Sequence, residues 1–127
     1  MTIAEVAKKY EISADTLRYY ERVGLIPSVT RDKNGNRNYT ETDCNWVQFA
    51  KCMRGAGMSV EKLIEYVKLF QWGIETLPAR KKLLIEQHEI LGAQITELQK
   101  IYEMLGKKID GYEEHIIAYE EEKLRQE

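Results

Sequence analysis

Leu17-Arg18-Tyr19-Tyr20-Glu21-Arg22-Val23-Gly24-Leu25 is the stretch that decides the fold of this 127-residue chain. Ser13 precedes it as an N-cap, because its hydroxyl can accept an otherwise unpaired backbone N–H. Gly24 closes it, because glycine readily takes the positive φ that ends many helices. The stretch therefore predicts a short helix with two faces. The buried face holds Ala14, Leu17 and Tyr20 at three-residue spacing, and the open face holds Asp15, Thr16, Arg18, Tyr19 and Arg22.

The open face of this helix suits a nucleic-acid duplex. Arginine can grip base edges or phosphates, and threonine and tyrosine hydroxyls can donate to phosphate. The alternative is a solvated face with ordinary Arg–Glu pairing, and this stretch alone does not decide between the two.

Charge is unevenly placed along the chain. The formal net charge is −2, with 31% charged and 43% apolar residues, a composition typical of soluble proteins. Residues 16–40 hold five basic and two acidic residues, net +3, whereas residues 76–127 hold eight basic and eleven acidic residues, net −3. There is no apolar run of ~20 residues for a membrane span and no secretory signal at the N-terminus. We therefore expect a cytoplasmic protein with no membrane partner.

The residues before the central stretch predict a helix-turn-helix. Thr2 and Glu5 fit a capping box, in which the threonine caps a first helix and the glutamate reaches back to the cap. Glu11-Ile12-Ser13 leaves room only for a tight turn. Two short helices joined in this way form the motif whose second helix reads a duplex.

The residues after the central stretch predict a β-hairpin wing. Asn34-Gly35 is a hairpin signal, since a type I′ turn needs positive φ at both central residues. The flanking runs, Val29 to Lys33 and Asn36 to Tyr39, would be its two strands. A single hairpin is only marginally stable, so it must lean on the helices or on a ligand.

Two further helices complete the expected head. Thr40 to Asp43 begins the third helix, with an acidic first turn that complements the helix dipole, and Gly55 helps to end it. Ser59 caps the fourth helix, and Met58 can pack on Leu63 as a hydrophobic staple.

A seven-residue repeat follows the head. Leucine or tyrosine recurs at Leu77, Leu84, Leu91, Leu98, Leu105, Tyr112 and Tyr119. Sustained heptads indicate a coiled coil, whose narrow apolar stripe one helix cannot bury alone. We therefore expect a homodimer, with an interface formed by Leu84, Leu91, Ile95, Leu98, Tyr102 and Leu105. The alternative is a helix that folds back on its own head.

These patterns divide the chain into three parts. Residues 1–75 form the expected winged helix-turn-helix DNA-binding domain, residues 76–119 the coiled-coil dimerisation helix, and residues 120–127 a frayed tail. Gly106 and Gly111 weaken the long helix, so a break or kink is allowed near residues 106–111, with a short last helix doubling back.

Several motifs, in this order, resemble the MerR family of bacterial transcription regulators over nearly the whole chain. The resemblance rests on Ile3-Ala4-Glu5-Val6-Ala7, on Leu17 to Glu21 followed by Gly24-Leu25, on Arg37-Asn38-Tyr39-Thr40, on Gly57-Met58-Ser59 and on the long heptad helix. It implies a mostly α fold, with a winged helix-turn-helix head, a small β-hairpin wing and a long helix that pairs antiparallel with its twin.

The resemblance also implies a function. The expected dimer binds a pseudo-palindrome in a promoter whose two recognition elements lie too far apart. It activates by bending and untwisting that DNA, which realigns the elements for RNA polymerase. Its partners are thus double-stranded promoter DNA, a second copy and, indirectly, RNA polymerase. The expected DNA-binding residues are Thr16, Arg18, Tyr19, Tyr20, Arg22, Lys33, Arg37 and Tyr39.

The residues that the expected long helix lacks argue against some classes of effector. Soft-metal sensors of this family carry cysteine ligands at the end of the dimerisation helix, and this chain has no cysteine after Cys52. His88 and His115 are isolated, so a metal sensor is not expected. Drug sensors add a large C-terminal domain, which the sequence to residue 127 does not contain.

The remaining resemblance is to a small branch that responds to aldehydes and other thiol-reactive electrophiles through one cysteine. The stretch Phe49 to Arg54 resembles that branch and makes Cys52 the expected sensor, with Lys51 and Arg54 placed to favour its thiolate. Cys44 competes, because it lies near a helix N-terminus, but a small core hydrophobe is the better interpretation there. Cys44 and Cys52 lie eight helical residues apart, which separates their Cα atoms by roughly 12 Å, too far for an intrachain disulfide.

Two alternatives stay open. The same regulator could sense a non-covalent small molecule between head and coil, or the chain could be a coiled-coil adaptor without a DNA role. No catalytic triad, metal-ligand cluster or glycine-rich phosphate loop is visible, so we expect neither an enzyme nor a cofactor.

Overall fold

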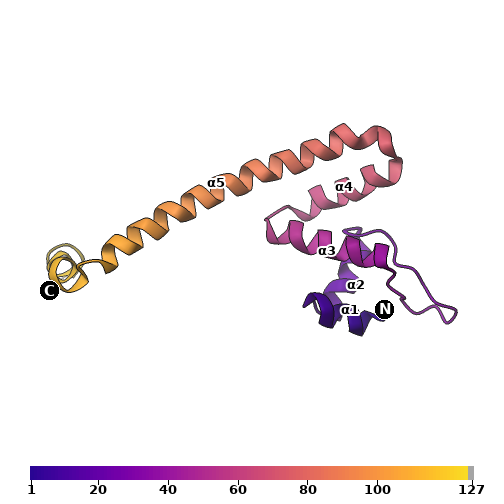
Figure 1. Cartoon of the computed structure of the whole chain (residues 1–127), viewed down its shortest axis with the longest axis horizontal. Coiled ribbons are helices and arrows are strands. Elements are labelled where there is room, and N and C mark those ends of the chain that lie inside the picture. Colours follow the sequence, from indigo (N-terminus) through magenta and orange to yellow (C-terminus); the bar gives the residue numbers. More distant parts are fainter. Residues whose placement is uncertain (126–127) are drawn as a thin grey trace. The chain divides into compact units, whose positions relative to one another are not determined.

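The computed structural model describes residues 1–125, without the side chains of residues 115 and 116. The chain forms two compact units, Met1–His88 and Glu89–Glu127. Its elements are α1 (Ile3–Tyr10), α2 (Ala14–Val23), α3 (Glu41–Gly55), α4 (Val60–Trp72), a 3₁₀ turn η1 (Ile74–Thr76), α5 (Leu77–Ile109), a π-helical turn η2 (Tyr112–Ile116), α6 (Ile117–Tyr119) and a second π-helical turn η3 (Glu120–Leu124) (Figure 1). The mostly α fold is confirmed. No helix among residues 1–125 has the length and apolar character that a membrane crossing requires.

Local capping starts α1 and α2 where the sequence predicts. The Glu5 N–H donates to Thr2 Oγ1 at 3.2 Å, and the Thr2 N–H donates to Glu5 Oε1 at 2.9 Å, which completes the capping box. The Thr16 N–H donates to Ser13 Oγ at 3.0 Å. Gly24 ends α2 with φ of 89°. Between the helices, Glu11 takes the left-handed conformation at φ of 54°, a role more often given to glycine or asparagine.

Side-chain N-caps also set the first residues of α3 and α4. Thr40 and Asp43 form a second capping box at the start of α3, and Ser59 Oγ accepts the N–H of Lys62 at the start of α4. The expected staple residues Met58 and Leu63 are both fully buried. These helices therefore begin at residues that local chemistry selects.

The core of the first unit lies among α1 to α4 and the connection after α2. It consists of Val6, Ile12, Leu17, Tyr20, Leu25, Ile26, Val29, Tyr39, Cys44, Val47, Ala50, Met58 and Leu63. The first part of α5 belongs to this unit. Leu84 packs against the core, and the buried Gln87 donates Nε2–H to the carbonyl oxygen of Ala56 at 2.8 Å.

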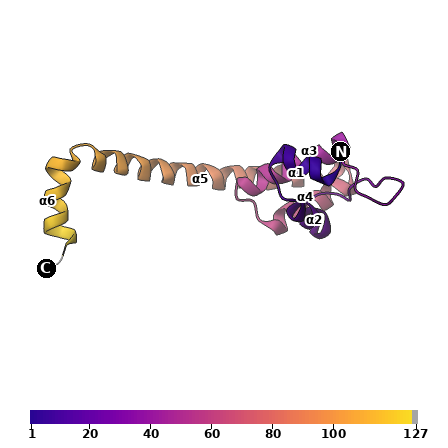
Figure 2. The same ribbon diagram turned by 90° about the horizontal axis from the view of Figure 1, so that it is seen from below.

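The prediction of a two-stranded β-hairpin wing is wrong. Within the described chain, residues 30–38 form a loop with one isolated antiparallel bridge between Arg31 and Arg37, and Figure 2 draws no strand arrow there. We call residues 30–38 the bridged loop. Only its flanking residues Val29 and Tyr39 are buried, so no alternating apolar face extends the pairing into strands.

The turn in the bridged loop also differs from the expected type I′. Asn34 does not take positive φ, and Gly35 alone does so, at 80°. Asp32 organises the turn: its Oδ1 accepts the N–H groups of Asn34 at 2.9 Å and Asn36 at 3.0 Å, and its carbonyl accepts the Gly35 N–H at 3.0 Å. The aspartate side chain thus outweighs the Asn-Gly preference.

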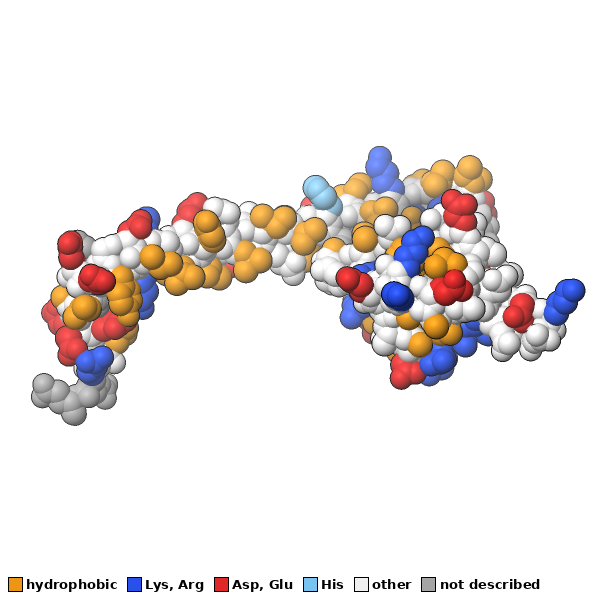
Figure 3. All heavy atoms as spheres, turned by 60° about the horizontal axis from the view of Figure 1, so that its bottom comes forward, with side chains coloured by type: hydrophobic (Ala, Val, Ile, Leu, Met, Phe, Trp, Pro, Cys, Tyr) orange, Lys and Arg blue, Asp and Glu red, His pale blue; other side chains and the backbone are white. Residues whose placement is uncertain are grey.

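The second unit is helical with an exposed apolar stripe. α5 ends at Ile109, and Gly111 follows with φ of 69°. Leu98 is 65% exposed and Tyr102 is 74% exposed, and hydrophobic side chains follow this part of α5 (Figure 3). Of the expected frayed tail 120–127, residues 120–124 form η3, and residues 126 and 127 lie outside the described residues.

Candidate nucleic-acid interface

The open face of α2 carries most of the predicted DNA-binding residues. Arg18 is exposed and pairs with Asp15 at 2.8 Å on the surface. Tyr19 is exposed, and the Arg22 guanidinium lies 5.6 Å from the centre of its ring. The Thr16 hydroxyl accepts a hydrogen bond from Ser13 at the start of the helix. Surface ion pairs are weak, so these side chains can exchange their local partners for a duplex at small cost.

Two predicted DNA-binding tyrosines lie in the core. Tyr20 is 8% exposed and Tyr39 is 2% exposed. Burial raises the pKa of both phenols, more than nearby positive charges lower it. Tyr39 Oη is buried without a hydrogen-bond partner in the described part of the chain. The structure therefore brings Thr16, Arg18, Tyr19 and Arg22 to one surface and places the two buried rings behind it.

Glu21 joins α2 to the bridged loop. Its side chain is 10% exposed. Oε1 accepts the Nε–H of Arg37 at 2.7 Å, and Oε2 accepts the N–H of Val29 at 2.9 Å. Arg31 lies farther away, with its terminal nitrogen 3.4 Å from each carboxylate oxygen. One carboxylate thus fixes both sides of the loop at its base.

The charge state of Glu21 follows from these contacts. Partial burial alone would raise its pKa, but the hydrogen bonds from Arg37 and the Val29 N–H, with the charges of Arg31 and Arg37, together hold the pKa below its ordinary value of 4.5. Glu21 is therefore ionised at neutral pH and holds its partners as a carboxylate.

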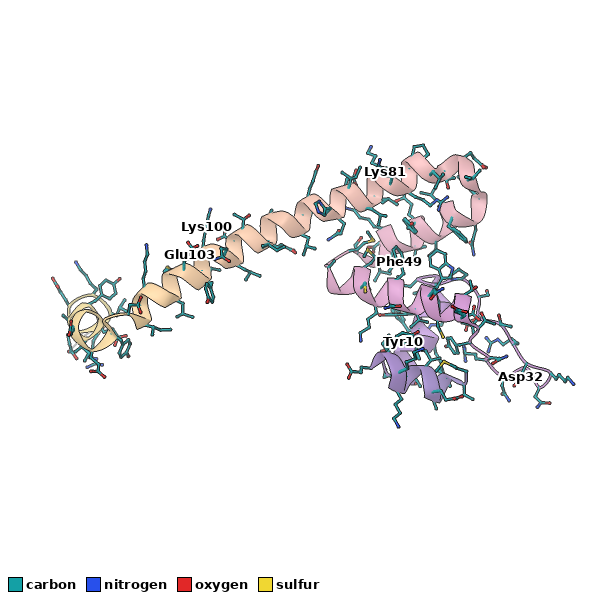
Figure 4. All side chains as sticks on the ribbon, viewed as in Figure 1. Tyr10, Asp32, Phe49, Lys81, Lys100 and Glu103 are labelled. Atoms are coloured by element: carbon teal, nitrogen blue, oxygen red, sulfur yellow. The ribbon has the colours of Figure 1, made fainter. Side chains whose placement is uncertain are left out.

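A groove of about 460 Å³ lies between the start of α1, α2 and the bridged loop. Its lining is Thr2, Ile3, Arg18, Arg31, Asp32, Gly35, Asn36 and Arg37. Figure 4 places Asp32 in the loop. The lining holds three guanidinium groups and the Asp32 carboxylate. Asp15 pairs with Arg18, and Glu21 pairs with Arg31 and Arg37, so the groove offers a polyanion guanidinium N–H donors rather than an excess of charge.

Sequence reasoning left Arg31, Thr2 and Asn36 out of the predicted binding residues. Arg31 and Arg37 flank the loop turn at positions that an antiparallel bridge brings opposite each other. That symmetric placement was the available signal for Arg31. Nothing in the sequence points to the approach of Thr2, because it depends on how α1 packs. Lys33 is exposed in the turn.

The two cysteines differ in environment. Cys52 is exposed near the end of α3, and Cys44 is buried with its Sγ 4.0 Å from Met1 Sδ. The neighbours expected to favour a Cys52 thiolate are engaged elsewhere. Lys51 donates to the carbonyl of Tyr10, and Arg54 donates to the carbonyl of Met58.

The expected dimer residues fall in both units. Leu84 is half-buried in the first unit, and Leu91 is half-buried. The remaining ones, Ile95, Leu98, Tyr102 and Leu105, are exposed. Among the side chains that the structure describes, no three His, Cys, Asp or Glu residues gather as a possible metal site.

Comparison with known proteins identifies relatives of this arrangement. The model of the MerR HTH family regulatory protein matches residues 1–69. The HTH-type transcriptional regulator AdhR of Bacillus subtilis is 54% identical over 91 residues, which cover 72% of this chain and 65% of AdhR. An uncharacterised HTH-type transcriptional regulator of Haemophilus influenzae is 35% identical over 112 residues, covering 88% of this chain and 83% of that protein.

Two solved structures share the fold. HiNmlR, described as a MerR family regulator lacking the sensor domain and bound to promoter DNA, has a TM-score of 0.81 and 35% identity, and the match covers 88% of this chain and 89% of that one. A MerR family transcriptional regulator from Bacillus thuringiensis has a TM-score of 0.79 and 27% identity, covering 88% of this chain and 98% of that one.

The Glu21 contacts predict how stability depends on pH. Because the folded-state pKa of Glu21 is depressed, its stabilisation is present above pH 4.5 and is lost as the pH falls through the folded-state value. Glu21→Gln should reduce the free energy of unfolding at pH 7 by about 1–3 kcal/mol, with a smaller difference at pH 3. Urea denaturation at both pH values measures this, with Lys68→Gln on the exposed face of α4 as the control. An equal loss at both pH values would contradict the assignment.

Proposed function

We propose, from the premise that this chain belongs to the MerR family of HTH regulatory proteins, that it binds a duplex promoter as a dimer through α2 and the bridged loop. MerR-family regulators are DNA-binding transcription regulators, and HiNmlR was solved bound to promoter DNA. The observation that carries the proposal is the groove with Arg18, Arg31 and Arg37 between the exposed face of α2 and the loop. Such a surface offers arginines both to base edges and to phosphates. This activity belongs in the cytoplasm, where promoter DNA lies.

The dimer forms, in this proposal, along the second half of α5. Ile95, Leu98 and Tyr102 are each more than half exposed on one helix. An isolated helix leaves this apolar stripe exposed to water and is not stabilised by it. A second antiparallel copy buries the stripe and so stabilises both helices. Two-fold symmetry then places two identical reading surfaces on one pseudo-palindrome.

Activation proceeds by deforming the promoter. A promoter with an over-long spacer presents its two recognition elements on the wrong faces of the duplex. Bending and untwisting the spacer realigns them, and RNA polymerase then binds without touching the regulator. The distortion energy, of order 1–6 kcal/mol, comes from the contacts that the bent duplex makes with both heads.

The effector, in this proposal, is an aldehyde or another thiol-reactive electrophile, and Cys52 is its target. The support is the exposed position of Cys52 near the end of α3 and the similarity to AdhR. The thiolate adds to the carbonyl carbon of the aldehyde, and the carbonyl oxygen takes a proton from water, which gives a hemithioacetal. Lys51 and Arg54, the neighbours expected to favour the thiolate, direct their hydrogen bonds to the backbone carbonyls of Tyr10 and Met58.

A second candidate is a non-covalent effector, favoured by an aromatic pocket in the first unit. This pocket of about 380 Å³ is lined by Thr42, Asn45, Trp46, Phe49, Tyr66, Phe70 and Arg80. Its volume lies in the range of small-molecule sites. Trp46 contacts both Phe49 and Phe70 edge to face, which makes an apolar wall.

The dimer proposal predicts a disruptive double substitution. Leu91→Asp with Leu98→Asp places charges in the apolar seam, so the variant should sediment as a monomer or as unfolded chain. Lys100→Asp, which lies off the stripe, is the matched control and should stay dimeric. A folded, fully dimeric double variant would exclude this interface.

Arg18 should contribute to sequence preference. The two probes are a duplex selected by the protein from a randomised pool and a scrambled duplex of the same length. Arg18→Ala should lose about 1–3 kcal/mol of preference between them, if a base contact is removed. Lys68→Ala on α4 is the control in the same anisotropy assay. Equal losses on both duplexes would reassign Arg18 to the phosphate backbone.

Cys52 should be needed for the response and not for binding. Transcription from the promoter is measured with and without formaldehyde or methylglyoxal. We expect Cys52→Ser to bind the promoter without responding, and Cys44→Ser, the matched control, to respond as the unmodified chain does. Normal induction of Cys52→Ser would refute the cysteine sensor and favour the aromatic pocket.

A further inference from the structure

The two arginines of the bridged loop are not equivalent. Both pair with Glu21, but Arg37 does so through Nε at 2.7 Å, and Arg31 only through a terminal nitrogen at 3.4 Å. The Arg37 side chain is 25% exposed, whereas that of Arg31 is 43% exposed. Arg37 therefore has a short, partly buried bond, and Arg31 has a long, open one.

Glu21 cannot satisfy both arginines equally. Its Oε2 already accepts the Val29 N–H at 2.9 Å, and its Oε1 accepts Arg37. Two guanidinium groups share one carboxylate, so the cluster keeps a net charge of +1. A competing anion should displace Arg31 from Glu21 before it displaces Arg37, because exposed ion pairs contribute little stabilisation.

The position of Arg31 fits such a competition. Arg31 lines the groove together with Arg18, Arg37 and the start of α1. Arg37 also lines the groove, but with Val29 it ties both sides of the loop to α2 through Glu21. Moving Arg37 to a phosphate would break the bond that ties the second side of the loop to Glu21, whereas moving Arg31 leaves both the Arg37 bond and the Val29 bond intact.

We propose that Arg31 is a phosphate-binding residue that leaves Glu21 when a duplex docks, while Arg37 stays on Glu21 as the fixed support of the bridged loop. This inference rests on the proposed DNA-binding function. It assigns to DNA a residue outside the expected DNA-binding set, and it assigns Arg37, which belongs to that set, a positioning role in place of a direct DNA contact. The anion is the duplex phosphate backbone.

The first test is the salt dependence of binding to a 24-base-pair scrambled duplex, measured by anisotropy between 50 and 200 mM KCl. Removing one arginine–phosphate pair should lower the slope of log affinity against log salt by about 0.9, so the affinity of Arg31→Gln should fall about threefold less over this range. Arg31→Lys keeps the charge and should keep the slope. Lys68→Gln is the control outside the surface. An unchanged slope for Arg31→Gln overturns the proposal.

The second test follows the guanidinium groups directly in the unmodified chain, so it does not depend on a variant that folds. In nitrogen-15 spectra, duplex should shift the Arg31 Nε resonance and leave the Arg37 Nε–H protected from exchange with water. A shift and loss of protection at Arg37, with Arg31 unmoved, would reverse the assignment and so overturn it. A chain that binds no duplex at any salt concentration would instead refute the proposed function itself.

Discussion

The first unit depends on α2 having one face in the core and one face open. Leu17 is fully buried and Tyr20 nearly so, while Arg18 and Tyr19 between them stay exposed. Burying the leucine and tyrosine against α1 and α3 sets the rotation of the helix about its axis, because helical residues three apart share a face. The exposed face cannot turn away without opening the core, so packing energy fixes which side chains a ligand meets.

Glu21 lies at the border of these two faces and extends the order of α2 to the bridged loop. The loop makes one antiparallel bridge and has buried residues only at its base. Its orientation therefore rests on polar contacts: Glu21 with Val29 and Arg37, and Asp43 with the N–H of Thr30 at 3.3 Å. A carboxylate in a basic surface costs affinity for a polyanion. Here that cost is offset by a loop held at a fixed place beside the reading helix.

The sequence predicted correctly those features that depend on contacts between residues close together in the chain. It did not predict those that depend on contacts between distant residues. The caps Thr2, Ser13, Thr40 and Ser59 were predictable, because each bonds a backbone group within three residues. The β-strands of the wing were not found, because Asp32 and Glu21 satisfy the loop without a ladder. Periodicity correctly placed Tyr20 on the buried face of α2, but Tyr20 and Tyr39 were both also expected to bind DNA, and Arg31 was left out of the expected DNA-binding residues. Both errors depend on contacts between residues far apart in the chain, such as the 16-residue separation of Glu21 and Arg37, which periodicity does not encode.

The central claim is that α2 and the bridged loop act together as one DNA-binding surface. Hydrogen–deuterium exchange of the unmodified chain, with and without a duplex selected from a randomised pool, tests it most directly. The account predicts that duplex slows exchange in residues 14–23 and in residues 30–38 together, and leaves α4 unchanged. Protection confined to one of these two segments, or found on α4 instead, would contradict it.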